Sequence, residues 1–327
     1  MPKLRRAATC QEAVHKGLGW LQARMQPDGA FGQDASDLQS CHKVPLLLNS
    51  TGHVEECRRC LDWLEEHLRL PDGSFRAPGD GARVNCTAWV AMGAQVSARF
   101  DLSLPAIRFL AASQGRHTGG VYEHEGHRRT ETYDLQTTAA AGLAFLFCGA
   151  VAEARLAGRC LGRALALQKD CKTFYIRFNV RGQPAIPSGK VTQPYAVAIG
   201  EPGQWYSALG MPAGFLVTLY RATGEEDFLD AAEGYLEIAH SCAPTAGEEV
   251  MAAPLAWAAA AYYHVTRSRR HLELAEKIVG FLLDHQREDG SWLPDGQASP
   301  EKVAPPVAIN TVATTTLVLN ECLREVQ

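Results

Sequence analysis

The chain has 327 residues, of which 46% are hydrophobic and 21% are charged, a composition typical of a soluble globular protein. Its formal net charge of −4 argues against a nucleic-acid or anionic-membrane partner, because both bind preferentially to a concentrated basic surface. No apolar run approaches the about 18 residues of a membrane span, and no apolar signal core follows Met1. We therefore expect a cytoplasmic protein without a nucleic-acid partner and without an integral membrane span.

The ten cysteines are expected to be reduced thiols. Four of them, Cys60, Cys148, Cys160 and Cys322, fall in apolar helical patterns, where a free cysteine behaves as a small hydrophobic residue. This placement favours a reducing cytoplasmic setting over a disulfide framework.

Helical periodicity predicts about twelve helices along the chain. In chain order they are expected at 8–25, 38–49, 53–69, 84–98, 102–113, 132–148, 150–168, 204–222, 226–241, 248–266, 269–286 and 307–325. Several have clear ends, because Thr51-Gly52 and Thr223-Gly224 supply the glycine that commonly ends a helix.

Two types of helix alternate in this series. The segment 54–70 is charged and amphipathic, whereas 137–149, 250–263 and 307–319 are almost entirely apolar and rich in small residues. A helix that is apolar on every side must be buried on every side. The alternation therefore predicts an inner ring of helices wrapped by an outer ring. The expected fold is all-α, an (α/α)6 toroid that forms one domain over 1–327.

A short sequence repeat supports stacked units. Lys277–Trp292 contains Gln286, then Asp-Gly, then an aromatic residue, and weaker copies lie at 16–31, 59–75, 106–122 and 165–175. Repeats at a regular spacing indicate a repeat architecture. Each copy falls at the end of an outer helix, where Asp-Gly is expected to make the turn and the aromatic ring to pack back over the helix. The glutamine is expected to bind backbone groups at a neighbouring helix terminus.

These repeats resemble the QW motifs of the terpenoid cyclase and protein prenyltransferase superfamily, whose members share the α/α toroid. Class II cyclases of that superfamily protonate an alkene with an Asp-x-Asp-Asp motif, which this sequence lacks. Prenyltransferase β subunits bind zinc through an Asp-x-Cys segment and a later histidine. Here Val84 stands two residues before Cys86, and Gln136 stands in place of the histidine. The resemblance therefore implies the toroid without either chemistry, and no metal or cofactor is expected.

A second segment, 203–232, is similar to parts of unsaturated glucuronyl hydrolases and sugar 2-epimerases, which are also α/α toroids. The similarity rests on Gly203-Gln-Trp-Tyr206, on Tyr220-Arg-Ala-Thr-Gly224 and on Leu229-Asp-Ala-Ala232. It implies a carbohydrate-active enzyme as an alternative.

The functional site is expected where the inner helices begin. Inner helices of a toroid run parallel, so their N-termini, each with a partial positive charge, gather at one end of the ring. The residues expected to face a substrate there are Asn85, Gln136, Gln204, Trp205, Tyr206 and Asn310. Further aromatic candidates for a cavity are Trp89, Trp257 and Tyr262, although aromatic residues at helical spacing more often belong to a core.

Asp134 is expected to carry acid–base chemistry, because it begins an inner helix ahead of an apolar run. Burial raises the pKa of a carboxyl group, which suits a general acid, whereas the helix N-terminus lowers it. The alternative is that Asp134 only caps the helix. Tyr133, beside it, and His42, at the start of another inner helix, are expected as proton partners.

The repeat is interrupted by an insertion at about 170–203. Alternating residues from Thr173 and a turn at Gly182 predict a short β-hairpin, with Arg177 placed to bind a carboxylate. Long insertions in compact repeats often form lids or binding loops, and a lid is expected here.

The leading hypothesis is a metal-independent cyclase or isomerase of natural-product biosynthesis that uses acid–base chemistry in the toroid cavity. Its substrate would be partly apolar with a polar or acidic group. One alternative is a carbohydrate-active toroid: a uronyl hydrolase, a lyase or a sugar epimerase. Another is a non-catalytic binding or scaffold toroid whose ring is filled by side chains. A homodimer is compatible with all three.

Overall fold

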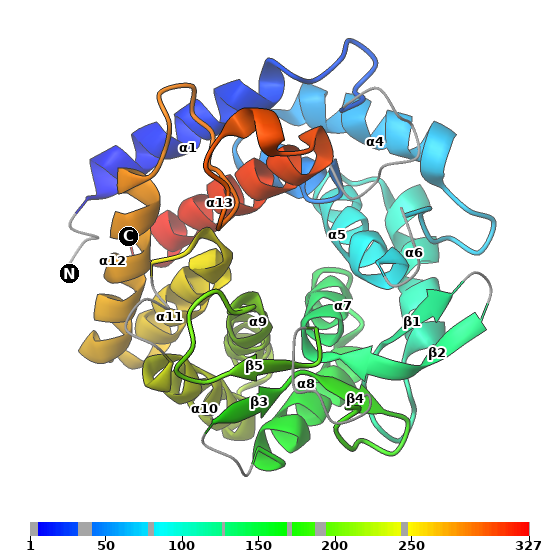
Figure 1. Ribbon diagram of the computed structural model, residues 1–327. Helices are drawn as coiled ribbons and strands as arrows, with labels where there is room; N and C mark the ends of the chain where they lie inside the picture. The colour runs from blue at the N-terminus through cyan, green and yellow to red at the C-terminus, as the bar shows by residue number, and fades with distance from the viewer. Residues whose placement is uncertain are drawn as a thin grey trace.

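The computed structural model describes residues 6–31, 41–77, 82–125, 128–168, 172–186, 194–242 and 248–326. Within these ranges, twelve α-helices form two concentric rings (Figure 1). The inner helices are α3 (Val44–Ser50), α5 (Arg83–Val96), α7 (Leu135–Phe147), α9 (Ser207–Thr223), α11 (Ala253–Thr266) and α13 (Pro305–Glu325). The outer helices are α1 (Ala7–Gln22), α4 (Val54–Leu68), α6 (Phe100–Ser113), α8 (Val151–Ala166), α10 (Glu226–Ser241) and α12 (Arg269–Asp284). The inner ring is closed, because α13 contacts both α11 and α3.

Small residues let the inner helices approach one another. A Cβ atom on Gly142 of α7 would lie 2.3 Å from the ring of Phe215 on α9. A Cβ atom on Gly214 of α9 would lie 2.2 Å from the ring of Trp257 on α11. Both separations are far inside van der Waals contact, so each glycine provides the space that the next helix fills with an aromatic ring. The small-residue composition that predicted burial thus also sets the spacing of the inner ring.

The repeated turns join neighbouring outer helices. Gly290, at a φ of 90°, packs so closely on α1 that a Cβ atom there would lie 2.4 Å from the carbonyl oxygen of Lys16. The Nε2 of Gln286 donates to the carbonyl oxygen of Ala13 at 2.9 Å, and the Nε1 of Trp292 donates to Leu282 at 2.7 Å. This last turn joins α12 to α1 and closes the outer ring.

A second copy shows the same geometry. Gly119, at a φ of 71°, packs against the backbone of Leu156 on α8, and Gln114 Nε2 donates to the carbonyl oxygen of Glu153 at 3.0 Å. In both copies the repeat glutamine binds backbone groups of a neighbouring helix, which is the role predicted for it.

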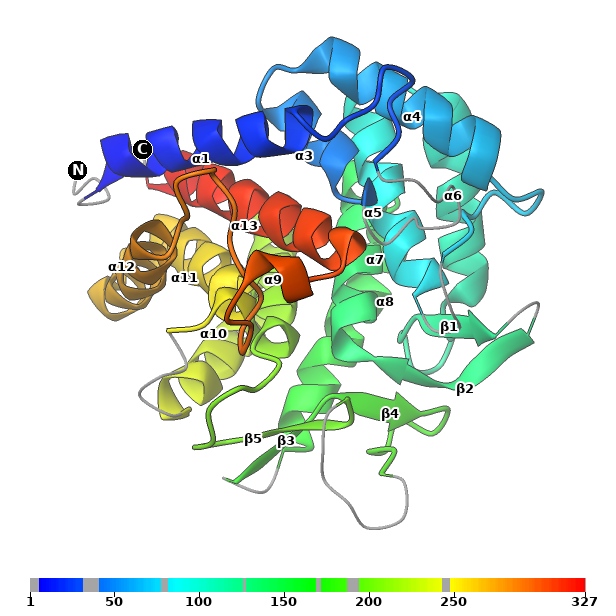
Figure 2. The same ribbon diagram turned by 45° about the horizontal axis from the view of Figure 1, so that its top comes forward.

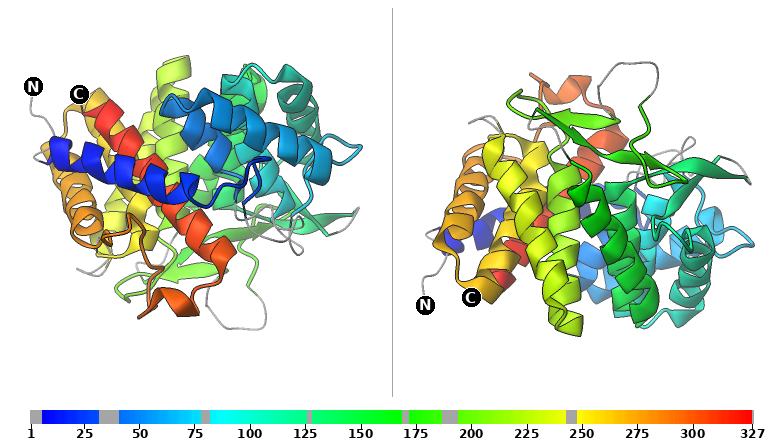
Figure 3. Two further views of the ribbon diagram at one scale, coloured as in Figure 1. Left: turned by 90° about the horizontal axis from the view of Figure 1, so that it is seen from above. Right: turned by 90° about the horizontal axis from the view of Figure 1, so that it is seen from below.

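Among the described residues, the five short strands lie at one end of the helical ring (Figures 2 and 3). One antiparallel sheet has the order β1 (Tyr122–Glu125), β2 (Arg128–Asp134) and β4 (Arg177–Asn179). In a second sheet, β3 (Thr173–Tyr175) pairs with β5 (Ala196–Ala198). Because β2 ends at Asp134, directly before α7, this end of the ring is where the inner helices begin.

The predicted boundaries need correction here. A helix was expected from 132, but residues through Asp134 belong to β2, and the β1–β2 hairpin was not predicted. The turn at Gly182 is present, with Asn179 N–H donating to the carbonyl oxygen of Gln183 at 2.9 Å. The other edge of β4 pairs with β2, so the insertion is tied into a larger sheet. That long-range pairing has no local sequence signal.

Two other helices begin later than predicted. The one expected at 204–222 is α9, which starts at Ser207, and the one expected at 248–266 consists of the 3₁₀ turn η2 (Val250–Ala252) followed by α11. A further 3₁₀ turn, η3 (Pro300–Lys302), precedes α13. Of the predicted helix 38–49, residues up to 40 lie outside the described residues. Among the helices that the structure describes, none is long and apolar enough to cross a membrane.

Candidate functional site

A cavity of about 520 Å³ runs along the axis of the inner ring, and all six inner helices contribute to its wall. It extends from the N-terminal ends of these helices, near Lys43 and Gln136, to their C-terminal ends, near Ser50 and Phe147. Its volume lies within the range of about 300–1,000 Å³ typical of small-molecule sites.

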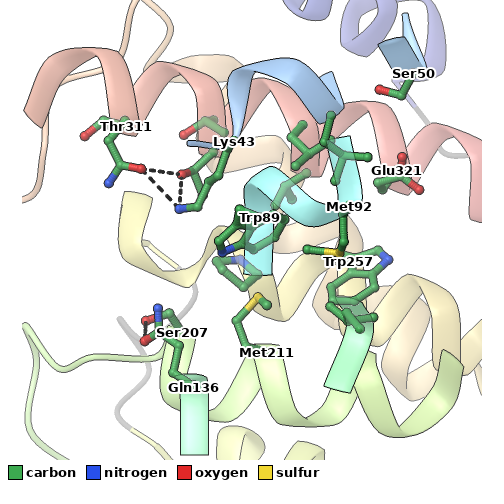
Figure 4. A pocket seen from close by; sticks show the side chains of 18 of the residues that line it. Lys43, Ser50, Trp89, Met92, Gln136, Ser207, Met211, Trp257, Thr311 and Glu321 are labelled. Atoms are coloured by element: carbon green, nitrogen blue, oxygen red, sulfur yellow. Dashed lines mark hydrogen bonds between the residues drawn. The ribbon is translucent and has the colours of Figure 1, made fainter. Parts of the chain in front are cut away.

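The middle of the cavity is apolar. Large side chains from three inner helices meet there, namely Trp89, Met92, Met211 and Trp257 (Figure 4). Trp89 and Trp257 belong to the aromatic candidates from the sequence. The two that were favoured lie elsewhere: Trp205 is 39% exposed, and the buried Tyr206 hydroxyl donates to the carbonyl oxygen of Glu201 at 3.0 Å. The cavity wall does not include Tyr262 either.

Polar side chains gather at the end where the inner helices begin. They are Lys43, Gln136, Ser207, Asn310, Thr311 and Thr314. Figure 4 shows Lys43, Thr311, Gln136 and Ser207 on one side of the apolar residues and Glu321 and Ser50 on the other. The cavity is thus polar at both ends and apolar between them.

Lys43 is the central polar group of the site, and the sequence predictions missed it. Its Nζ donates to Thr314 Oγ1 at 2.7 Å and to Asn310 Oδ1 at 3.2 Å, and it lies 5.4 Å from the centroid of the Trp89 ring. Both acceptors are neutral. Burial lowers the pKa of the Lys43 ammonium group to about 8, because a low-dielectric surrounding disfavours its charge.

Gln136 and Ser207 form a second polar pair at this end. Ser207 Oγ donates to Gln136 Oε1 at 3.1 Å, which fixes the amide so that its NH₂ group remains as a donor. Gln136 and Asn310 are the two predicted substrate-binding residues that line the cavity. Together with Lys43 they present hydrogen-bond donors to a ligand.

The opposite end of the cavity carries an ion pair. Arg324 NH1 donates to Glu321 Oε1 at 3.0 Å, and burial raises the pKa of the Glu321 carboxyl group. Among the described residues that line the cavity, Glu321 is the only carboxylate. A pair of opposed carboxylates, which most glycosidases use, is therefore not present in this lining.

Asp134 lies at the N-terminus of α7 and caps it. Its Oδ1 accepts the backbone N–H of Thr137 at 2.7 Å, and it is not part of the cavity wall. The geometry therefore matches the capping alternative, and catalysis by Asp134 stays a prediction. Arg177 faces Asp134 in the strand register, and its guanidinium group lies 5.3 Å from the Tyr195 ring centroid.

The predicted proton partners also lie outside the cavity wall. Tyr133 packs between the rings of Tyr122 and Phe178, with centroids 5.2 and 5.8 Å away, and burial raises its pKa. His42 is 3% exposed and directly precedes Lys43. The buried face of β2 thus holds Tyr133 in the protein core.

Two further predicted substrate-binding residues make contacts in the framework around the site. Gln204 Oε1 accepts the N–H of Ala198 at 3.0 Å and so holds the loop between β5 and α9. The backbone N–H of Asn85 donates to Glu123 Oε1 at 3.2 Å. Neither residue lines the cavity.

Glu123 is a buried acid that the sequence predictions missed, because it lies in the unpredicted strand β1. Its carboxylate accepts the N–H of Val84 at 2.9 Å, the N–H of Asn85 and, at 3.4 Å, the hydroxyl of Thr137. It therefore links the N-termini of α5 and α7. Burial raises the pKa of the Glu123 carboxyl group to about 7, although the backbone N–H groups that donate to it lower that pKa.

No family model matches this sequence, and no curated protein matches it. The structure is similar to that of a D-mannose isomerase, at 12% identity and a TM-score of 0.75 over 96% of this chain and 97% of that chain. It is similar to a type II terpene cyclase from Scytonema in complex with geranylgeranyl dihydroxybenzoate, at 14% identity, a TM-score of 0.64, and 98% and 99% coverage. An unsaturated glucuronyl hydrolase specific for heparin gives 12% identity, a TM-score of 0.63, and 98% and 96% coverage. These similarities confirm the predicted α/α toroid.

Proposed function

We propose that the chain is an enzyme that holds a largely apolar small molecule along the axis of the ring and converts it by acid–base chemistry, as an isomerase or cyclase. The observation that carries this proposal is Lys43, an ammonium group with neutral hydrogen-bond partners at one end of an apolar cavity. The cavity also speaks against the scaffold alternative, which expected a ring filled by side chains.

The lining supports one orientation of the substrate. An acidic or carbonyl group would lie against Lys43, where the Gln136 amide adds a further donor. The apolar part would lie between Trp89, Met211 and Trp257. A charge-assisted hydrogen bond in a dry site is stronger than one between neutral groups, so Lys43 would fix the polar end.

Lys43 also suits proton transfer. A pKa of about 8 keeps both the ammonium and the free amine populated near neutral pH, which favours general acid–base catalysis. In an isomerisation of a substrate that binds through a neutral carbonyl group, the free amine of Lys43 would take a proton from the carbon next to that carbonyl, and the resulting ammonium would return the proton at another position. The predicted roles of Asp134, Tyr133 and His42 are less well supported, because none of them lines the cavity.

The second candidate is an isomerase of a sugar or uronic acid. It is supported by the similarity to the D-mannose isomerase and by the polar residues around Lys43. The four large apolar side chains in the middle of the cavity favour the apolar substrate instead, since a sugar offers hydroxyl groups on nearly every carbon.

The experiment is a calorimetric titration with geranylgeranyl dihydroxybenzoate, with the same compound lacking the carboxylate, and with D-mannose. We expect the acid to bind at least about tenfold more tightly than its decarboxylated counterpart. Lys43→Gln should remove that difference, whereas Lys302→Gln, at an exposed position on η3, should retain it. Chromatography after incubation then tests for conversion: of the acid by cyclisation, and of D-mannose, which carries a proton next to its carbonyl group, by isomerisation.

Tighter binding of D-mannose than of the acid would favour the sugar candidate. Equal binding of the acid by wild type and Lys43→Gln would contradict the orientation. Binding without any conversion of acids or sugars would indicate a binding protein without catalytic activity.

A further inference from the structure

A cluster of potential metal ligands lies on the outer wall of the ring, away from the cavity. Glu233 and Glu237 on α10 and His271 on α12 each offer one ligand atom, and these three atoms lie within 4.8 Å of one another. None of the three residues lines the axial cavity.

Helices α10 and α12 bring the three ligand groups close together. Glu233, Glu237 and His240 follow one another at i, i+4 and i+7, so they lie on one face of α10. His271 comes from the first turn of α12 and meets that face. Two outer helices that are separate in the sequence thus supply one cluster.

His271 is held in a fixed orientation. It is 1% exposed, its Nδ1 lies 3.2 Å from His240 Nε2, and its ring meets the Tyr262 ring edge-on at a centroid distance of 4.7 Å. A hydrogen bond to one ring nitrogen fixes the plane of the imidazole and leaves the other nitrogen for a metal.

We propose that Glu233, Glu237 and His271 bind one divalent transition-metal ion such as Zn²⁺, which joins α10 to α12. One imidazole and two carboxylates form a mixed nitrogen–oxygen set that suits Zn²⁺ with water in the remaining position. Mg²⁺ prefers oxygen ligands alone, so His271 selects against it. Arg270 pairs with Oε1 of Glu237, and the ion would compete with this exposed contact. Its role would be structural, since the cavity is elsewhere.

The test is a titration of chelator-treated full-length protein with Zn²⁺ alone, followed by calorimetry and by thermal unfolding. We expect one equivalent to bind and to raise the melting temperature, because an ion that binds only the folded state stabilises it. Mg²⁺ should do neither. Co²⁺ should give the visible absorption bands of a low-coordinate site with a nitrogen ligand.

Glu233→Gln is the decisive variant, since Glu233 is exposed and its replacement leaves the core intact. It should weaken Zn²⁺ binding by about tenfold or more. The matched control is Glu273→Gln, at an exposed position of α12, which should bind as the wild type does. Circular dichroism confirms that both variants fold.

The proposal is overturned if the wild type binds no single equivalent, or if Glu233→Gln and Glu237→Gln both bind Zn²⁺ as tightly as wild type. Binding of geranylgeranyl dihydroxybenzoate in the cavity should be unchanged in Glu233→Gln, so failure of this site and failure of the proposed function are distinguishable.

Discussion

Replacing Lys43 by methionine should make the protein more stable at neutral pH. Methionine has a similar length and no charge, so it keeps the packing against Trp89 and removes the buried ammonium group. A pKa lowered from 10.5 to about 8 corresponds to at most about 3 kcal/mol of destabilisation of the folded state by that charge. Partial exposure of Lys43 and the loss of two hydrogen bonds reduce the expected gain in the free energy of unfolding to about 1–2 kcal/mol.

The sign of the pH dependence follows from the same shift. Below about pH 8, Lys43 is charged in both states, and the folded state carries the full penalty. Between about pH 8 and 10.5 the unfolded chain binds more protons than the folded one, so wild-type stability rises with pH. The advantage of Lys43→Met should therefore shrink across that window.

Urea unfolding at about pH 7 and about pH 10, followed by tryptophan fluorescence, measures both effects. Lys302→Met serves as the exposed control and should change stability little. A Lys43→Met variant that is less stable than wild type at neutral pH would contradict this expectation, because the ammonium group would then be stabilised where it lies.

Three further changes test the framework around the site. The Glu123 carboxyl group holds its proton more tightly in the folded protein than in the unfolded chain. The free energy of unfolding of the wild type should therefore fall by up to about 3 kcal/mol as the pH rises from 4.5 to about 7. In urea unfolding, Glu123→Gln should abolish this pH dependence. Gly290→Ala should destabilise by more than about 2 kcal/mol in the same assay, because of its positive φ and its contact with Lys16; an unchanged midpoint would disprove the close packing. Asp134→Ala should lower the free energy of unfolding by about 1 kcal/mol, because it removes the hydrogen bond to Thr137, whereas Asp134→Asn should keep most of that stability. Unchanged substrate conversion by Asp134→Asn would exclude Asp134 as the acid–base group.

The sequence predicted the architecture well because the fold depends on signals that are local and repeated. The apolar run of α7 and the charged face of α4 each identify a ring, and the turn at Gly290 repeats along the chain. Strand β2 escaped prediction because its partners, β1 and β4, depend on long-range pairing, and its last residues run directly into a helix.

The candidate site was harder to predict. Polarity at the start of an inner helix identified Gln136 and Asn310, which do line the cavity. The same rule also selected Asp134, whose side chain turns back to cap its own helix. Lys43 lines the cavity as the N-cap residue of α3, whereas its neighbour His42 is buried, and no local sequence signal distinguishes the two.

The most direct measurement of the central claim is a crystal structure of the protein with bound geranylgeranyl dihydroxybenzoate. We expect the carboxylate within hydrogen-bond distance of Lys43 Nζ, with the apolar chain between Trp89 and Trp257. A carboxylate bound at Arg324, at the opposite end of the cavity, or a ligand outside the ring would contradict it.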